Sequence, residues 1–125
     1  MSFQGLTFGV VREVMQAERR VAATPATVKK MVSAGGHVLV EAGAGVGSHF
    51  SDAEYEAAGA KVLADVEALF AQADVILKVK EPQPRPSHQK HEVDMMRAGQ
   101  CLVTFLHPAS PDNHELIRNL AARGV

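Results

Sequence analysis

Short apolar runs alternate along this chain with helical segments of roughly ten residues, and this alternation limits the possible folds more than any other feature. Strands that alternate with helices form βαβ units, in which parallel strands build a sheet and helices cover both of its faces. We therefore predict an α/β domain of three layers, with a parallel sheet flanked by helices. The expected strands are Leu6–Val11, His37–Ala42, Ala60–Leu63, Val75–Lys80 and Gln100–Leu106.

Capping signals mark the expected helix starts. Thr24-Pro25 and Ser110-Pro111 each place a hydroxyl before a proline, which is a typical start of a helix. Further helices are expected after Ser51, after Asp65 and over Gln89–Arg97.

The composition excludes several classes of protein. The chain has 125 residues, enough for one domain, and a net charge of −1, so no nucleic-acid partner is expected. No apolar run approaches the roughly 20 residues of a transmembrane helix, and the N-terminus lacks the layout of a signal peptide. The single cysteine, Cys101, argues against a disulfide framework and is expected to be a small core residue. These observations favour a soluble, cytoplasmic protein.

The chain stops at Val125, directly after the expected end of its last helix at Gly124. A sheet of this kind is expected to continue with a further strand at that point. We therefore expect the domain to be truncated before its last elements.

Three residues with useful chemistry are expected at one edge of the sheet. Ligands of open parallel sheets bind beyond the carboxyl ends of the strands. Lys80 ends one predicted strand, His107 follows another, and Arg20 lies in the polar segment after the first. A guanidinium can hold a carboxylate by two hydrogen bonds, a lysine can polarise a carbonyl, and a histidine can transfer a proton near neutral pH. Together they suit a small anionic substrate such as an amino or keto acid.

Each of these residues also has a structural interpretation. Arg20 could pair with Glu18 on the surface, Lys80 could extend into solvent, and His107 could mark the entry to a helix. Lys78 is expected to face the opposite side from Lys80 and to be structural. The remaining histidines, at positions 37, 49, 88, 91 and 114, match no metal motif, and no metal is expected.

Composition also marks two loops. Prolines at positions 82, 84 and 86 predict a loop without regular structure. Gly43–Gly47 has the spacing G-x-G-x-G, whereas the dinucleotide fingerprint needs G-x-G-x-x-G with a helix starting inside it. A tight loop that needs positive φ angles is the preferred interpretation, and nucleotide binding is the weaker alternative. No cofactor-binding residue is predicted in this chain.

Four blocks of residues occur in an order and spacing typical of one family: Glu18–Pro25, Glu41–Gly45, Lys78–Pro82 and Thr104–His107. The chain resembles the N-terminal domain shared by alanine dehydrogenase and the alpha subunit of proton-translocating NAD(P) transhydrogenase. The resemblance covers nearly all of the chain. Its most specific blocks are R-V-A-x-T-P and K-V-K-E-P.

The resemblance implies a flavodoxin-like, Rossmann-like fold and a divided active site. Residues 1–125 would form the substrate-side domain, and NAD, or NADP, would be bound mainly by a Rossmann domain absent from this chain. Arg20 and Lys80 would hold the carboxylate and carbonyl of the substrate, and His107 would act as acid and base between imine and ketone. The catalytic aspartate of the family would lie outside these residues, so this fragment alone is expected to be inactive.

The resemblance leaves two branches of the family. Transhydrogenases usually lack the second lysine and the histidine, so Lys80 and His107 favour alanine dehydrogenase, which converts L-alanine, NAD and water to pyruvate, ammonium and NADH. The long loop Gln83–Lys90 and the segments Arg20–Val28 and Glu92–Gly99 are more similar to the transhydrogenase subunit. That subunit takes part in hydride transfer between NADH and NADP and docks on a membrane partner. A non-catalytic module that binds a small carboxylate is a further alternative, and the family implies a homo-oligomer.

Overall fold

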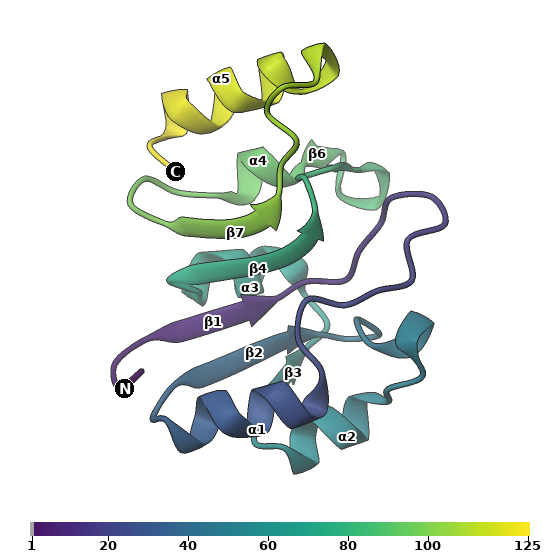
Figure 1. Ribbon diagram of the computed structural model, residues 1–125, viewed down its shortest axis with the longest axis vertical. Coiled ribbons are helices and arrows are strands. Elements are labelled where there is room, and N and C mark those ends of the chain that lie inside the picture. Colours follow the sequence, from purple (N-terminus) through teal and green to yellow (C-terminus); the bar gives the residue numbers. More distant parts are fainter. Residues whose placement is uncertain (1) are drawn as a thin grey trace.

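A five-stranded parallel sheet organises the domain, as the computed structural model of residues 2–125 shows (Figure 1). Its strands are β1 (Thr7–Val10), β2 (His37–Glu41), β3 (Lys61–Leu63), β4 (Val75–Lys80) and β7 (Cys101–Phe105). Across the sheet they follow the order β3-β2-β1-β4-β7, and every neighbouring pair is parallel. Each strand agrees with its prediction to within one residue at either end.

The helices begin at the predicted capping residues or close to them. The Oγ1 atom of Thr24 accepts the N–H of Thr27, and the side chains of Ser51 and Asp65 cap the next two helices. The helices are α1 (Pro25–Ser33), α2 (Asp52–Ala57), α3 (Val66–Gln72), α4 (Glu92–Met95) and α5 (His114–Arg123), with 3₁₀ turns η1 (Val46–Ser48), η2 (Pro86–His88) and η3 (Pro111–Asn113). Within residues 2–125, no helix combines the length and apolar character that a membrane span requires.

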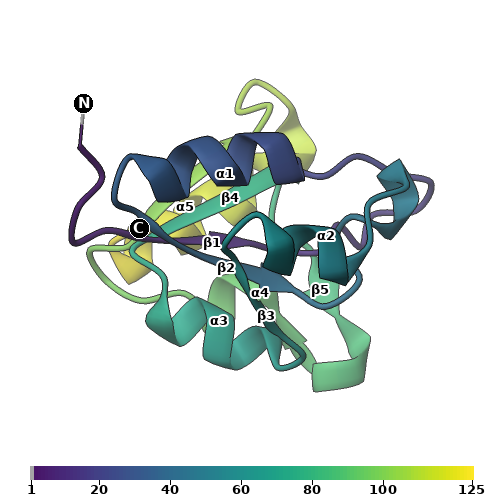
Figure 2. The same cartoon turned by 90° about the horizontal axis from the view of Figure 1, so that it is seen from below.

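Helices lie on both faces of the sheet, so the predicted three-layer fold is confirmed. In Figure 2, α1 lies on one face and α3 on the other. Val28 of α1 packs with Val10 and Val40 on the first face, whereas Leu69 of α3 packs with Ile76 on the second. Counted along the chain, the strand order is 3-2-1-4-5, which is the Rossmann order rather than the 2-1-3-4-5 order of flavodoxin.

The proline-rich segment after β4 is more regular than predicted. A short antiparallel hairpin forms there, with β5 (Pro84–Arg85) paired to β6 (Lys90–His91). The helix predicted over residues 89–97 is reduced to the four residues of α4, because His91 is held in the hairpin and caps the helix that follows it. The hairpin is stabilised from outside, through the buried side chain of Arg85.

The first face of the sheet is left open over β7. Val103 is 53% exposed and Phe105 is 68% exposed, although both are large apolar residues of a strand that was predicted from its apolar sequence. Cys101, which we expected in the core, is also exposed on β7. The physical reason is the lateral position of α1: it packs over β2 and β1, so it leaves the far edge of the sheet at β7 uncovered.

Candidate functional site

Arg20 lies in the loop between β1 and α1 and is paired with Glu18. Its Nη2 donates to Oε1 of Glu18 at 2.6 Å, and its Nε donates to Oε2 at 3.0 Å. These hydrogen bonds lower the pKa of Glu18 from 4.5 to about 2. Arg20 therefore forms the ion pair with Glu18 that was considered from the sequence. Its side chain nevertheless remains 63% exposed at the mouth of a cleft.

The three predicted site residues line one cleft at the carboxyl edge of the sheet. Arg20, Lys80 and His107 enclose a volume of about 270 Å³ together with Val79 and Phe105. Three segments that are far apart in the sequence supply them: the loop after β1, the end of β4 and the turn after β7. The juxtaposition expected from strand ends is therefore present in the structure.

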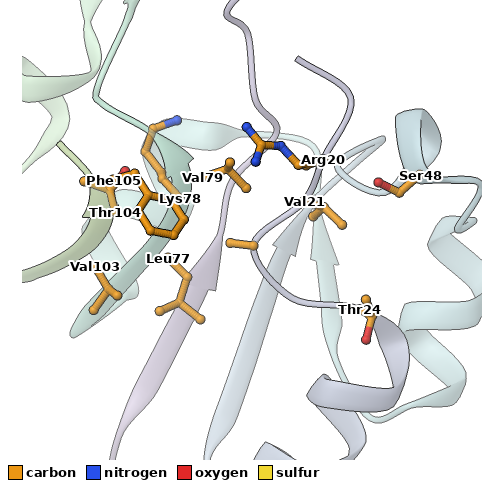
Figure 3. A pocket seen from close by; sticks show the side chains of 11 residues that line it. Arg20, Val21, Thr24, Ser48, Leu77, Lys78, Val79, Val103, Thr104 and Phe105 are labelled. Carbon is orange, nitrogen blue, oxygen red and sulfur yellow. The ribbon is translucent and has the colours of Figure 1, made fainter. Parts of the chain in front are cut away.

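A larger and mainly apolar cleft of about 460 Å³ adjoins the first, because Arg20, Val79 and Phe105 line both. Figure 3 shows Arg20 on one side of this cleft and Val103 and Phe105 on the other. Thr24, at the start of α1, lines the same cleft. A small anion bound near Arg20 would thus have apolar surface beside it.

Lys80 reaches the cleft because β4 is irregular. Leu77 pairs with Val103 but Lys80 pairs with Phe105, so β4 advances three residues while β7 advances two. In a regular strand, residues 78 and 80 would share a face. The extra residue instead places Lys80 on the side of Phe105, and the prediction that the two lysines face opposite sides is confirmed for this reason.

The backbone of Lys80 is fixed, and its charge is not neutralised. Thr104 Oγ1 donates to the carbonyl oxygen of Lys80 at 2.8 Å, and Glu13 Oε1 accepts the N–H of Lys80 at 3.0 Å. The ammonium group makes no ion pair with any residue between 2 and 125. The ammonium group of Lys80 is therefore available to an anion in the cleft.

His107 occupies a left-handed turn directly after β7, with a φ angle of 53°. Asn113 Nδ2 holds this turn by donating to the carbonyl oxygens of Leu106 and His107 at 2.9 and 3.2 Å. His107 Nδ1 lies 3.7 Å from Oε2 of Glu81, a buried atom with no hydrogen-bond partner among the described residues. The ring of His107 is thus oriented by a carboxylate on one side while it lines the cleft on the other.

Lys78 belongs to a buried network of charges on the opposite face. Its Nζ lies 3.3 Å from Oε1 of Glu13 and 3.3 Å from Oε1 of Glu92, and its side chain is fully buried. Arg85 continues the network by donating to Glu92 and to both carboxylate oxygens of Glu41. Burial lowers the pKa of Arg85, but its hydrogen bonds and charge interactions with the two carboxylates outweigh this and raise it. The structural role predicted for Lys78 agrees with this geometry.

The glycine loop after β2 supports the Arg20 loop. A Cβ atom added to Gly47 would lie 2.7 Å from the carbonyl oxygen of Arg19, and Ser48 Oγ donates to the same oxygen at 2.8 Å. Gly43 has the predicted positive φ angle, of 79°, whereas Gly47 is required for close approach. The nearest α-helix begins only at Asp52, so the loop offers no helix N-terminus to a diphosphate.

Sequence reasoning gave no role to three residues that shape this site. Glu13 and Thr104 were recognisable only as polar residues near strand ends, and Arg85 only as a residue among prolines. Their partners lie 67, 24 and 44 residues away in the chain. No local pattern could have identified such pairs.

Comparison with known proteins places the chain in a family. Residues 9–125 match the model of the alanine dehydrogenase/PNT N-terminal domain. The chain belongs to this family. An alanine dehydrogenase from Halomonas elongata is 44% identical over 108 residues, covering 86% of this chain and 28% of that protein.

Solved structures from both branches share the fold of the domain. An L-alanine dehydrogenase structure superposes with a TM-score of 0.78 at 34% identity and covers 92% of this chain and 30% of its own. A transhydrogenase from Sinorhizobium meliloti gives a TM-score of 0.79 at 38% identity, covering 94% of this chain and 32% of its own. The chain thus spans less than a third of the length of each of these proteins.

Proposed function

We propose that this chain is the substrate-side domain of an NAD-dependent oxidoreductase of the alanine dehydrogenase type. The reaction of the whole protein is the conversion of L-alanine, NAD and water to pyruvate, ammonium and NADH. The observation that carries the proposal is the convergence of Arg20, Lys80 and His107 on one cleft. A homo-oligomer and a cytoplasmic location remain predictions.

Arg20 and Lys80 provide two cationic groups for one small carboxylate. Arg20 donates to Glu18 through Nε and Nη2, and its Nη1 has no acceptor among the described residues. The ammonium of Lys80 has no ion pair within residues 2–125 and faces the same cleft. In this proposal Arg20 binds the carboxylate of alanine or pyruvate, and Lys80 binds its carboxylate and polarises its carbonyl.

His107 supplies the proton transfers between imine and ketone. Oxidised alanine is an imine, and a water molecule adds to its carbon while His107 accepts the proton of that water. The same proton then moves to the nitrogen of the resulting carbinolamine. As the bond from carbon to nitrogen breaks and ammonia leaves, the hydroxyl group loses its proton to His107 and the carbonyl of pyruvate forms. Glu81, 3.7 Å from Nδ1, would stabilise the protonated ring between these steps.

NAD is proposed to be held by a Rossmann domain outside residues 1–125. The glycine loop of this chain does not fit a dinucleotide, because no helix starts within it and Gly47 packs on the backbone of Arg19. When bound, NAD supplies the acceptor for the hydride of alanine. The choice between NAD and NADP would be made by the nucleotide-binding residues of that Rossmann domain.

The test is NAD reduction driven by L-alanine, followed by absorbance with the product of the complete reading frame. The variant Lys80→Ala is expected to lower kcat/KM for alanine by at least about 100-fold, because the ammonium group that binds the substrate carboxylate is removed and the alanine side chain offers no other donor. Lys61→Ala is the matched control, since Lys61 is an exposed lysine at the start of β3. Full alanine turnover by Lys80→Ala would contradict the role of this lysine.

The second candidate is the soluble alpha subunit of an NAD(P) transhydrogenase. The specific observation in its favour is the similarity to the S. meliloti transhydrogenase, which is 38% identical to this chain, whereas the L-alanine dehydrogenase structure is 34% identical. A folded product that binds NADH but does not respond to alanine, and that transfers hydride only with a membrane partner, would favour this candidate.

A further inference from the structure

The last residues of β4 have lost their strand partner on one side. The pairing between β1 and β4 ends at Val10 and Leu77, because β1 itself ends at Val10. Beyond this point the chain leaves β1 and turns into the Arg20 loop, past the end of β4 (Figure 1). The N–H groups of Val79 and Lys80 therefore need another acceptor, since an unsatisfied buried N–H group is costly.

One carboxylate takes the place of the missing strand. Glu13 Oε2 accepts the N–H of Val79 at 3.0 Å, and Oε1 accepts the N–H of Lys80 at 3.0 Å. The Nζ of Lys78 lies 3.3 Å from Oε1 and balances the charge. The side chain of Glu13 is almost completely buried, so these three donors replace the water that would otherwise solvate it.

The position of this carboxylate coincides with the irregularity in β4. Between Leu77 and Lys80 the register against β7 shifts by one residue, which turns Lys80 to the cleft face. Both N–H groups that Glu13 accepts lie inside this shifted segment. Thr104 holds the same segment from the other side, through the carbonyl oxygen of Lys80.

We propose that Glu13 is a positioning residue: its carboxylate stabilises the irregular end of β4 and so holds Lys80 at the substrate cleft. The role of Lys80 in binding substrate rests on the proposed function, whereas the anchoring of its backbone does not. Only an ionised carboxylate offers two acceptor oxygens and a negative charge to two N–H groups and a lysine together. A glutamine would present a donor to one of these three donors.

The experiment compares two variants of the product of the complete reading frame. Glu13→Gln keeps the size of the side chain and replaces one acceptor oxygen by an N–H donor. Glu92→Gln is the matched control, because it removes the other buried carboxylate next to Lys78 and leaves Val79 and Lys80 bonded to Glu13. We would measure kcat/KM for L-alanine, KM for NAD, and deuterium uptake by a peptide that contains residues 79 and 80.

Glu13→Gln is expected to lower kcat/KM for alanine by about tenfold to 100-fold, because a small displacement of Lys80 weakens its contact with the reacting group. KM for NAD should not change, and deuterium uptake at residues 79 and 80 should become faster. Glu92→Gln should leave these three quantities close to those of the wild type. Equal losses in both variants would show that the network only stabilises the fold, and would overturn the proposal, as would unchanged alanine kinetics in Glu13→Gln.

Two further outcomes keep the test decisive. If Glu13→Gln does not fold, the double variant Glu13→Gln/Lys78→Met removes the charges of both Glu13 and Lys78, while Glu92 keeps its ion pair with Arg85, and the same loss for alanine is expected. If the wild type does not oxidise alanine, the proposed function fails, and deuterium uptake alone tests the anchor. Faster uptake in Glu13→Gln than in Glu92→Gln would then support the anchoring role, and equal uptake would overturn it.

Discussion

Lys78 and Lys80 lie two residues apart on β4 but have opposite surroundings. Lys78 is fully buried between the carboxylates of Glu13 and Glu92, on the face that α4 covers. Lys80 opens into the cleft with Arg20 and forms no ion pair with the described residues. The difference shows that a K-V-K sequence can place one lysine in a buried network and the other in a cleft when the strand contains an irregularity between them.

The same contrast extends to the ion pairs of the two faces. The network around Lys78 is buried and joins the loop after β1 with β2, β4, β5 and α4, so its members are held from several elements at once. The pair of Arg20 and Glu18 is local and its arginine is mostly exposed. The side chain of Glu18 is only 7% exposed, but the guanidinium of Arg20 faces solvent, and a substrate carboxylate can therefore compete for the arginine.

The largest expected effect comes from Lys78→Ala. Removing this lysine leaves Glu13 and Glu92 facing one another in the interior, and breaking a buried pair in this way costs about 3–5 kcal/mol of unfolding free energy. The measurement is hydrogen exchange of β4 peptides in increasing urea. The exposed lysine variant Lys61→Ala should change the unfolding free energy by less than about 0.5 kcal/mol. Similar losses of unfolding free energy in the two variants would show that Lys78 stabilises the fold no more than a surface lysine does.

Gly47→Ala tests whether the glycine loop supports the open side of the site. The new Cβ atom would lie 2.7 Å from the backbone oxygen of Arg19, so one loop must move, at a cost of about 1–3 kcal/mol. We expect a higher KM for alanine, because Arg20 adjoins the displaced residue. Ser48→Ala removes only the hydrogen bond to the same oxygen and should have a smaller effect. An unchanged KM in Gly47→Ala would show that the loop does not position Arg20.

The strands were predictable because their signals are local, whereas the site depended on distant pairs. Apolar runs between capping residues located β4 without error and the other strands to within one residue. The hairpin formed by β5 and β6 was not predictable, because it depends on the contact of Arg85 with Glu41, 44 residues earlier. The exposure of Cys101 depends on how far the helical layer extends over β7, which no pattern within β7 records. The proximity of Arg20, Lys80 and His107 was predictable because the strand ends of a parallel sheet share one edge, whereas their role in a reaction stays a prediction.

Thr104→Val is expected to have a moderate effect at the boundary between the two faces. The substitution keeps the shape of the side chain and removes the hydrogen bond to the carbonyl of Lys80, which is worth about 1 kcal/mol. We expect this loss of stability together with a modest decrease in kcat/KM for alanine. Thr27→Val is the control, since it removes a hydroxyl from an exposed position on α1. A loss in Thr27→Val equal to that in Thr104→Val would mean that the contact with Lys80 has no special weight.

The smallest expected effect is the pH dependence of the Arg20–Glu18 pair. The hydrogen bonds from Arg20 lower the pKa of Glu18 from 4.5 to about 2, so the pair adds stability above pH 4.5 that is lost as the pH falls towards 2. The difference in stability between the wild type and Glu18→Gln should therefore be present near neutral pH and become smaller at about pH 3. Glu56→Gln, at an exposed position on α2, serves as the control for general effects of acid. A difference for Glu18→Gln that stayed constant with pH would show that the pair does not form in solution. Arg20 would then be available to a substrate carboxylate without competition, and the contrast with the fixed partners of Lys78 would become sharper.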